Sequence, residues 1–162
     1  MWREVTTLWQ SVLDPEYAHL LLEALPLYGL GIGLTFLIVA FVVGEKICRL
    51  LALAVIALSC ASVWPYLELR DEATVRILAV HPPADAPAIR AQTRLRHDTA
   101  WAYYAMALLA AATLAGARTP KLRLLIPVTV FAGMVLFWLS IWLHKKEAEV
   151  YHRNTIRQIQ RR

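Results

Sequence analysis

Four long apolar runs alternate with polar connectors along this chain. The runs cover roughly residues 24–43, 50–64, 99–115 and 124–143. A helix needs about 20 apolar residues to cross about 30 Å of hydrocarbon, and each run is close to that length. Inside a bilayer the backbone must satisfy its own hydrogen bonds, so we expect the runs to be transmembrane helices. The pattern predicts an all-α, integral membrane four-helix bundle that forms a single domain over residues 1–162.

The segment before the first run predicts a short amphipathic N-terminal helix. Apolar residues, Trp2 and Trp9 among them, recur there at helical spacing between polar positions. This pattern is typical of a helix that lies in the headgroup region with its tryptophans facing the lipid. Asp14 and Pro15 then offer a cap and a first helical residue, so we expect a new helix to run from Pro15 through the first span.

Two further segments lie outside the predicted spans. Residues 67–97 form an extramembrane connection, within which Asp85 and Pro87 can start the helix that becomes the third span. After the fourth span, residues 145–162 predict a basic C-terminal helical extension whose apolar stripe is thin. We expect this extension to touch lipid headgroups.

Composition favours a membrane protein over a soluble bundle. Hydrophobic residues make up 59% of the chain, and the charged residues lie between or beyond the apolar runs. Most of the 17 Lys and Arg belong to the side that holds both termini, which predicts an N-in, C-in protein of the bacterial inner membrane. The basic residues flank spans and form no aromatic-interleaved patch, so nothing indicates nucleic-acid binding.

Small residues predict how the spans pack. Gly29 and Gly33 form a Gly-x-x-x-Gly pair in the first span, which permits a close approach of two helices. Ala107, Ala111 and Ala115 follow one another at single-turn spacing in the third span. We therefore expect the glycine face of span 1 to contact the alanine face of span 3.

Histidines are the best clue to chemistry, because an even number of spans places all of them on one side of the membrane. They are His19, His81, His97, His144 and His152. Three of these stand at span thresholds at similar depth, on three different helices. Haem iron takes two axial ligands from facing helices in a bundle core. The sequence thus predicts a b-type haem, with His19 and His97 as the favoured axial pair and His144 as a further candidate.

Neighbours of His97 suit the same haem site. Arg94 and Arg96 lie within one helical turn of it and can hold propionates at the membrane surface. Trp101 lies four residues further on, where it shares a helix face with His97. An interfacial histidine without any ligand is the plain alternative.

A family resemblance supports a redox role. A histidine precedes span 1, span 2 ends in small and aromatic residues, and the sequence RHDTAWAYY opens span 3. These features resemble the four-span bacterial inner-membrane proteins known as domain of unknown function 2231, and more distantly b-type cytochromes, over about residues 15–116. Leu20 follows His19, whereas that family commonly has proline there. The resemblance implies a membrane redox protein that binds b-type haem or serves an electron-transfer complex.

A di-metal carboxylate site competes with haem. Glu16 with His19, and Glu149 with His152, are both Glu-x-x-His pairs on the same side of the membrane. Di-iron and di-manganese bundles use two such helices and two more that supply glutamates. Surface charge on amphipathic helix ends is the ordinary interpretation of the same residues.

A third hypothesis needs no cofactor. No span carries the mid-membrane charge expected of an ion path, and no Ser/His/Asp or Cys/His set has a common site. The chain can then be an accessory subunit, in contact with the bilayer and with other membrane subunits.

Overall fold

The described part of the chain is helical and forms one bundle. A computed structural model describes residues 15–80, 82–116 and 124–151. In chain order the elements are α2 (Pro15–Val43), α3 (Lys46–Ala61), α4 (Val63–Val80), the short 3-10 helix η1 (Pro83–Asp85), α5 (Ala86–Ala115) and α6 (Leu125–Tyr151). The all-helical prediction is confirmed for these residues. The predicted amphipathic helix over 1–14 and the tail after Tyr151 lie outside them.

A proline-based signal located the start of α5 correctly. α5 begins at Ala86 with Pro87 in its first turn, whereas α2 is described from Pro15 onward, so its predicted start stays a prediction. The predicted extramembrane connection is itself a helical hairpin, in which η1 joins α4 to the first turns of α5. Ala73 of α4 and Ile89 of α5 are buried, so this hairpin has packed sides.

A break at Ser62 separates α3 from α4. Pro65 follows in the first turn of α4. Because proline has no N–H, it cannot bond to the carbonyl of Ala61 in α3, and the helical hydrogen bonding is interrupted there. The Ser62 hydroxyl donates to the Ser59 carbonyl at 2.7 Å, and the Tyr66 N–H reaches the Ser62 carbonyl at 3.2 Å. The chain therefore keeps its direction through the break, and α4 extends the line of α3.

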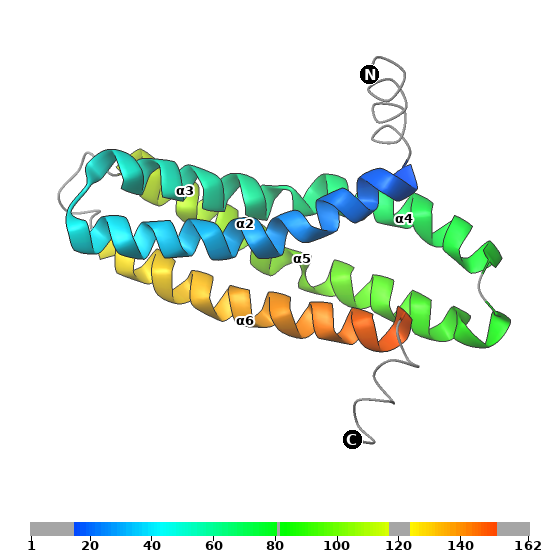
Figure 1. The fold of residues 1–162 in the computed structure, drawn as a ribbon. Coiled ribbons are helices and arrows are strands. Elements are labelled where there is room, and N and C mark those ends of the chain that lie inside the picture. Colours follow the sequence, from blue (N-terminus) through cyan, green and yellow to red (C-terminus); the bar gives the residue numbers. More distant parts are fainter. Residues whose placement is uncertain (1–14, 81, 117–123, 152–162) are drawn as a thin grey trace, which may run out of the picture.

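The helices form a closed ring in which each packs against its neighbours. α2 contacts α3, α4 and α6, while α5 contacts α3, α4 and α6. α2 and α5 thus lie diagonally across the bundle, and Figure 1 shows α2, the α3–α4 line, α5 and α6 running alternately in opposite directions. At one end a tight turn joins α2 to α3 through Gly44, whose φ of +86° is the left-handed conformation that closes many helices.

Gly29 and Gly33 make the close helix approach that the sequence predicts. A Cβ on Gly33 would lie 2.6 Å from Ile56 Cγ1 and 3.4 Å from the Ala52 carbonyl oxygen. A Cβ on Gly29 would lie 2.0 Å from the Ser59 hydroxyl. Glycine is needed at both positions because the partner helix occupies the space of a side chain.

The partner of that glycine face was predicted wrongly. Ser59, Ile56 and Ala52 belong to α3, the sequence neighbour of α2, whereas the predicted alanine face is on α5. Ala111 and Ala115 are exposed. Spacing identified a close-packing face, but it carried no information on which helix fills it.

Hydroxyl pairs join α5 to α6 within the apolar part of the bundle. Tyr103 and Ser140 lie 2.7 Å apart, and Thr113 and Thr129 lie 2.8 Å apart. Ser140 also donates to a carbonyl one turn back in its own helix, and each threonine hydroxyl lies within hydrogen-bond distance of such a carbonyl, so one threonine donates to its own helix and the other donates across the pair. Such interhelical hydrogen bonds hold helices together where lipid removes the hydrophobic drive to associate.

The outer surface of the bundle is apolar. Phe131, Trp138 and Leu108 are each at least 70% exposed, whereas soluble proteins rarely present large contiguous apolar surfaces. Three stretches of the described residues are long and apolar enough to cross a membrane: Leu22–Val43, Lys46–Ala79 and Leu125–Val150. α5 runs beside them, and the crossing predicted for its apolar half stays a prediction.

Replacing Gly33 by leucine is expected to push α2 and α3 apart. Overfilling a packed interface costs about 1–3 kcal/mol, so the thermal unfolding midpoint in detergent should fall by several degrees. Ile32→Leu is the matched control, because Ile32 is 54% exposed on the outer face of the same helix. Equal midpoints for Gly33→Leu and Ile32→Leu would show that the close approach contributes nothing.

Both ends of the described chain lie at one end of the bundle (Figure 1). If all four helix lines cross the bilayer, reporter enzymes fused to the two termini should face the same compartment. Reporters in opposite compartments would mean that one helix, α5 by its composition, does not cross. Protease accessibility of the same fusions in sealed vesicles provides an independent measurement.

Candidate functional site

A buried group of charged side chains lies at the bundle end where the described chain begins and ends. Its members come from all four sides of the ring, and we call them the Arg–Glu cluster: Glu23 of α2, Tyr66 and Arg70 of α4, Arg96 of α5 and Glu147 of α6. Arg70 is 1% exposed and Glu147 is 6% exposed. Charged groups are almost never buried to this degree unless they are paired.

Glu147 is the centre of the Arg–Glu cluster. One of its oxygens accepts from Arg70 Nη1 at 2.5 Å, and the other accepts from Arg96 Nη2. Each carboxylate oxygen is therefore engaged by a different guanidinium from a different helix. Charge-assisted hydrogen bonds of this kind are about twice as strong as neutral ones.

Tyr66 and Thr93 complete the surroundings of Arg70. Arg70 Nη1 donates to the Tyr66 hydroxyl and Nε donates to the Thr93 hydroxyl at 3.4 Å. The guanidinium carbons of Arg70 and Arg96 lie 5.7 Å and 5.8 Å from the Tyr66 ring centroid, within the range of a cation–π contact. Among the described residues, Arg96 Nε is the one buried side-chain polar atom without a hydrogen-bond partner.

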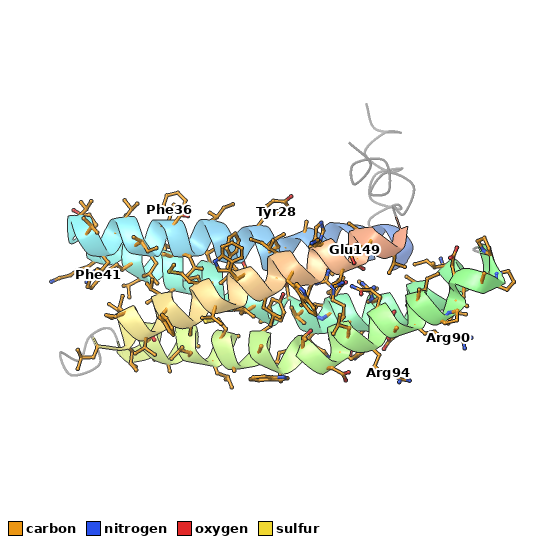
Figure 2. The ribbon with its side chains drawn as sticks, turned by 90° about the horizontal axis from the view of Figure 1, so that it is seen from below. Tyr28, Phe36, Phe41, Arg90, Arg94 and Glu149 are labelled. Atoms are coloured by element: carbon orange, nitrogen blue, oxygen red, sulfur yellow. The ribbon has the colours of Figure 1, made fainter. Side chains whose placement is uncertain are left out.

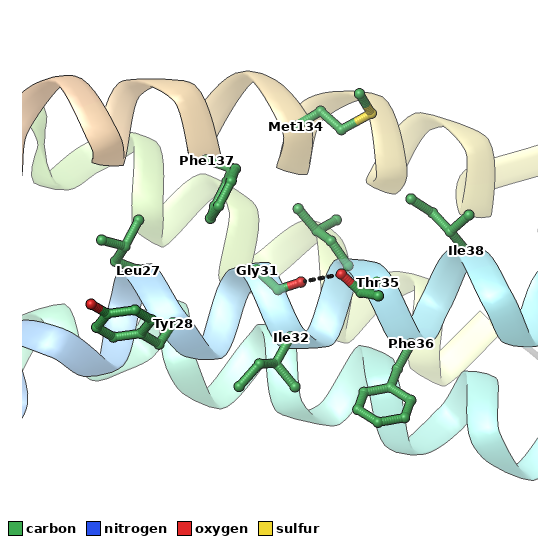
Figure 3. Close-up of a pocket in the computed structure, with 10 residues that line it drawn as sticks. Leu27, Tyr28, Gly31, Ile32, Thr35, Phe36, Ile38, Met134 and Phe137 are labelled. Atoms are coloured by element: carbon green, nitrogen blue, oxygen red, sulfur yellow. Dashed lines mark hydrogen bonds between the residues drawn. The ribbon is translucent and has the colours of Figure 1, made fainter.

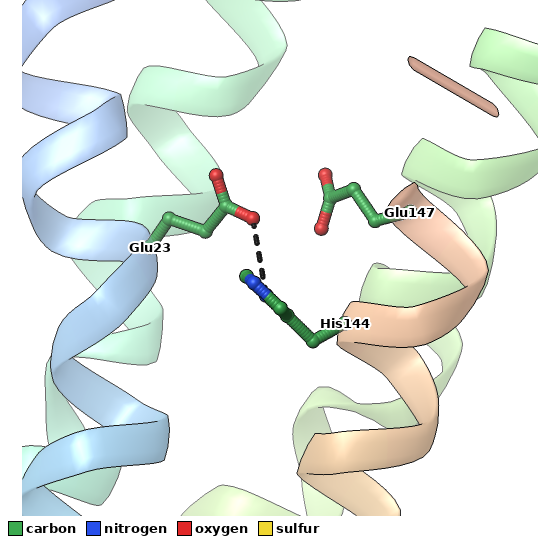
Figure 4. A group of neighbouring side chains, drawn as sticks. All are labelled: Glu23, His144 and Glu147. Carbon is green, nitrogen blue, oxygen red and sulfur yellow. Dashed lines mark ion pairs between the residues drawn. The ribbon is translucent and has the colours of Figure 1, made fainter. Parts of the chain in front are cut away.

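Glu23 balances the second arginine and extends the Arg–Glu cluster toward the surface. Its Oε1 lies 3.8 Å from Arg96 Nη2 and 3.5 Å from His144 Nδ1. Two arginines and two glutamates then face one another, so the formal charges cancel. His144 is half-exposed, with 49% of its side chain open, and it stands at the edge between α2 and α6 (Figure 4).

The structure brings some predicted site residues together and separates others. Arg96 belongs to the Arg–Glu cluster and His144 adjoins it. His97 lies instead on the outer side of the α4–α5 pair, where Nε2 is 2.9 Å from Asp71 Oδ1 and both side chains are largely exposed. Trp101 is 70% exposed, and Arg94 is exposed and points away from the bundle (Figure 2).

These positions bear on the predicted haem site. His97 bonds to α4, and its helix lies diagonally opposite α2, which carries His19. Arg96, expected to hold a propionate, already binds Glu147. The side chain of His19 lies outside the described ones. The described residues of the predicted site thus do not share a cavity, and the assignment of His19 and His97 as axial ligands stays a prediction.

The predicted di-metal residues are also separate from the Arg–Glu cluster. Glu149 pairs with Lys146 at 2.9 Å on the surface of α6, while the Glu16 side chain and His152 lie outside the described part. A different trio, Glu23, His144 and Glu147, has ligand atoms within 4.8 Å of one another (Figure 4). A cation there would have to displace guanidinium groups from Glu147, so the donor set favours an ion-pair network over a metal site.

Sequence reasoning missed Arg70 and Glu147 as partners. The available signal was position along the helix: each long helix line carries charged residues close to the same end of its apolar run, and one of them on each line belongs to the Arg–Glu cluster. These residues are Glu23, Arg70, Arg96 and Glu147. Opposite charges at one depth on neighbouring helices pair when their helix faces also coincide.

Comparison with protein-family models, with curated protein sequences and with solved structures finds no match to this chain. The family resemblance described above stays a prediction.

Neutralising Glu147 should test the structural weight of the Arg–Glu cluster. Glu147→Gln leaves Arg70 and Arg96 facing an uncharged group, and breaking a buried pair in this way costs about 3–5 kcal/mol. We expect a large fall in the unfolding midpoint measured by circular dichroism in detergent.

Glu149→Gln is the matched control on the same helix, because Glu149 pairs with lysines at the surface. It should leave the midpoint unchanged. Similar midpoints for the two variants would mean that the Arg–Glu cluster contributes no more than a surface ion pair.

Proposed function

We propose that this chain is an accessory component of a membrane assembly, without a catalytic role of its own. The observation that supports this proposal is that the charged groups of the Arg–Glu cluster are already paired with one another. Both oxygens of Glu147 bind arginines, and Glu23 balances the second guanidinium. General acid or base catalysis needs a group that can reach a substrate proton, whereas these groups face one another inside the bundle.

The shape of the bundle supports an assembly role. The hairpin of α4 and α5 projects past the end of α6 (Figure 1), and it presents exposed charged residues such as Arg90 and Arg94 (Figure 2). The Arg–Glu cluster fixes this hairpin to α2 and α6 at its base. A rigid polar arm on an apolar bundle is suited to contact another membrane subunit. We place the protein in the bacterial inner membrane with both termini inside, on the distribution of Lys and Arg.

A redox component that binds b-type haem is the second candidate. The observation that favours it is the pairing of two histidines with carboxylates, His97 with Asp71 and His144 with Glu23. Histidines that ligate metals commonly direct their second nitrogen at a carboxylate, which fixes the ring. His19 lies one turn before Glu23 on α2, so His144 would be nearer to it than His97 is.

The visible spectrum separates the two functions. Protein purified from its own membranes under mild detergent, then oxidised and dithionite-reduced, is expected to show no Soret or α band. Bands that disappear in His144→Ala or His97→Ala would establish the haem function and overturn the accessory proposal.

Native gel electrophoresis of gently solubilised membranes tests the assembly itself. The chain should migrate well above the position of the purified protein in the same detergent. Migration at the position of the purified protein would contradict an accessory role.

A further inference from the structure

An apolar groove of about 480 Å³ runs along the bundle surface between α2 and α6. Gly31 and Phe137 both line the groove and lie close together, since a Cβ on Gly31 would lie 2.8 Å from Phe137 Cε2. Tyr28, Phe36 and Met134 line its sides (Figure 3). The Thr35 hydroxyl donates to the Gly31 carbonyl at 2.9 Å, so this polar pair is satisfied within the wall. The groove therefore suits an apolar chain.

Helical spacing places the His144–Glu23 pair at one end of this groove. Glu23 lies one turn before Leu27, which lines the groove from α2, and His144 lies two turns after Phe137, which lines it from α6. Residues at these separations share a helix face. An apolar chain in the groove would bring its polar head to the half-exposed imidazole at the bundle end (Figure 4).

Charge at this end excludes a strong attraction for a phosphate headgroup. Arg70 and Arg96 are balanced by Glu147 and Glu23. The lysines that follow His144 both lie near Glu149, at 4.0 Å and 2.9 Å. A ligand with a neutral headgroup fits this end better. It needs no unpaired Lys or Arg, so no cation has to be displaced from its carboxylate.

The tautomer of His144 determines whether the headgroup of the ligand must donate or accept the hydrogen bond. Nδ1 lies 3.5 Å from Glu23 Oε1, and an ionised Glu23 at this position accepts a hydrogen bond from a protonated Nδ1. In the neutral imidazole Nε2 is then an acceptor, so the guest must donate. A phenolic hydroxyl on a neutral ring has this property, whereas a ring carbonyl does not.

We propose that the α2–α6 groove and the His144–Glu23 pair together bind a membrane quinol, with a ring hydroxyl donating to His144 Nε2 and the isoprenoid chain lying along Gly31. This inference concerns binding alone, goes beyond the accessory role and does not depend on it.

Calorimetric titration of the full chain in phosphatidylcholine nanodiscs tests the proposal. The probe is a benzoquinol with a decyl chain, kept reduced under argon. Wild type should bind it saturably. His144→Ala should weaken binding about threefold to tenfold, the value of one neutral hydrogen bond. His97→Ala is the matched control, because His97 is exposed on the α4–α5 side, and it should bind as wild type does.

Three further arms identify the contacts and the source of the ligand. The dimethyl ether of the same quinol cannot donate, so it should bind wild type weakly and lose nothing further in His144→Ala. Gly31→Val, checked for folding by circular dichroism, should block the chain. Nanodiscs rich in phosphatidylglycerol should leave quinol affinity unchanged.

Several results would overturn the proposal. These are equal binding by wild type and His144→Ala, equal losses in both histidine variants, full binding of the ether, or displacement of the quinol by anionic lipid. The last result would assign the groove to phospholipid. None of them alters the spectrum or the native gel that test the accessory function.

Discussion

The carboxylate of Glu147, held between two guanidinium groups, is the interaction on which the rest of the bundle depends. It reaches Arg70 and Arg96, and through Arg96 it reaches Glu23, so one connected group of charges spans the whole ring of helices. Because buried charges tolerate little separation, the helices must keep one axial register at this end. The break at Ser62 is compatible with that demand, since α4 remains helical and presents Tyr66 and Arg70 on the same face.

The apolar end of the bundle is held by different means. There Gly33 admits Ile56, and the hydroxyl pairs join α5 to α6. In lipid, apolar side chains gain little by leaving one apolar environment for another, so close packing and hydrogen bonds must provide specificity. The bundle thus has an ionic end that fixes register and an apolar end that fixes the distance between helix axes. Each end supplies what the other lacks.

The sequence was sufficient to predict the helices, but it was insufficient to predict which neighbouring helix each face contacts. Pro87 marked the start of α5, because proline is well tolerated in the first turn of a helix, although Pro26 lies inside α2. Gly29 and Gly33 marked a close-packing face, but α3 fills it and not α5. The Arg–Glu cluster escaped prediction for the same reason. Spacing along one helix predicts which residues share a face of that helix. Which helix packs against that face depends on the order of the helices around the ring. Four spans of similar composition contain no local signal for that order.

The order of the helices around the ring also explains where an apolar ligand can bind. Sequence neighbours such as α2 and α3 are joined by a short turn and by glycine contacts, so their seam is tight. α2 and α6 close the ring from opposite ends of the chain, and no loop holds them together. Their seam is secured at the ionic end by Glu23, which reaches Arg96 and His144, while beyond Phe137 the two helices leave the groove beside Gly31. The groove lies on the outer side of this seam, where Gly31 packs against Phe137 and Gly133 packs against Leu34, so it can accept a chain from the bilayer without disturbing the Arg–Glu cluster.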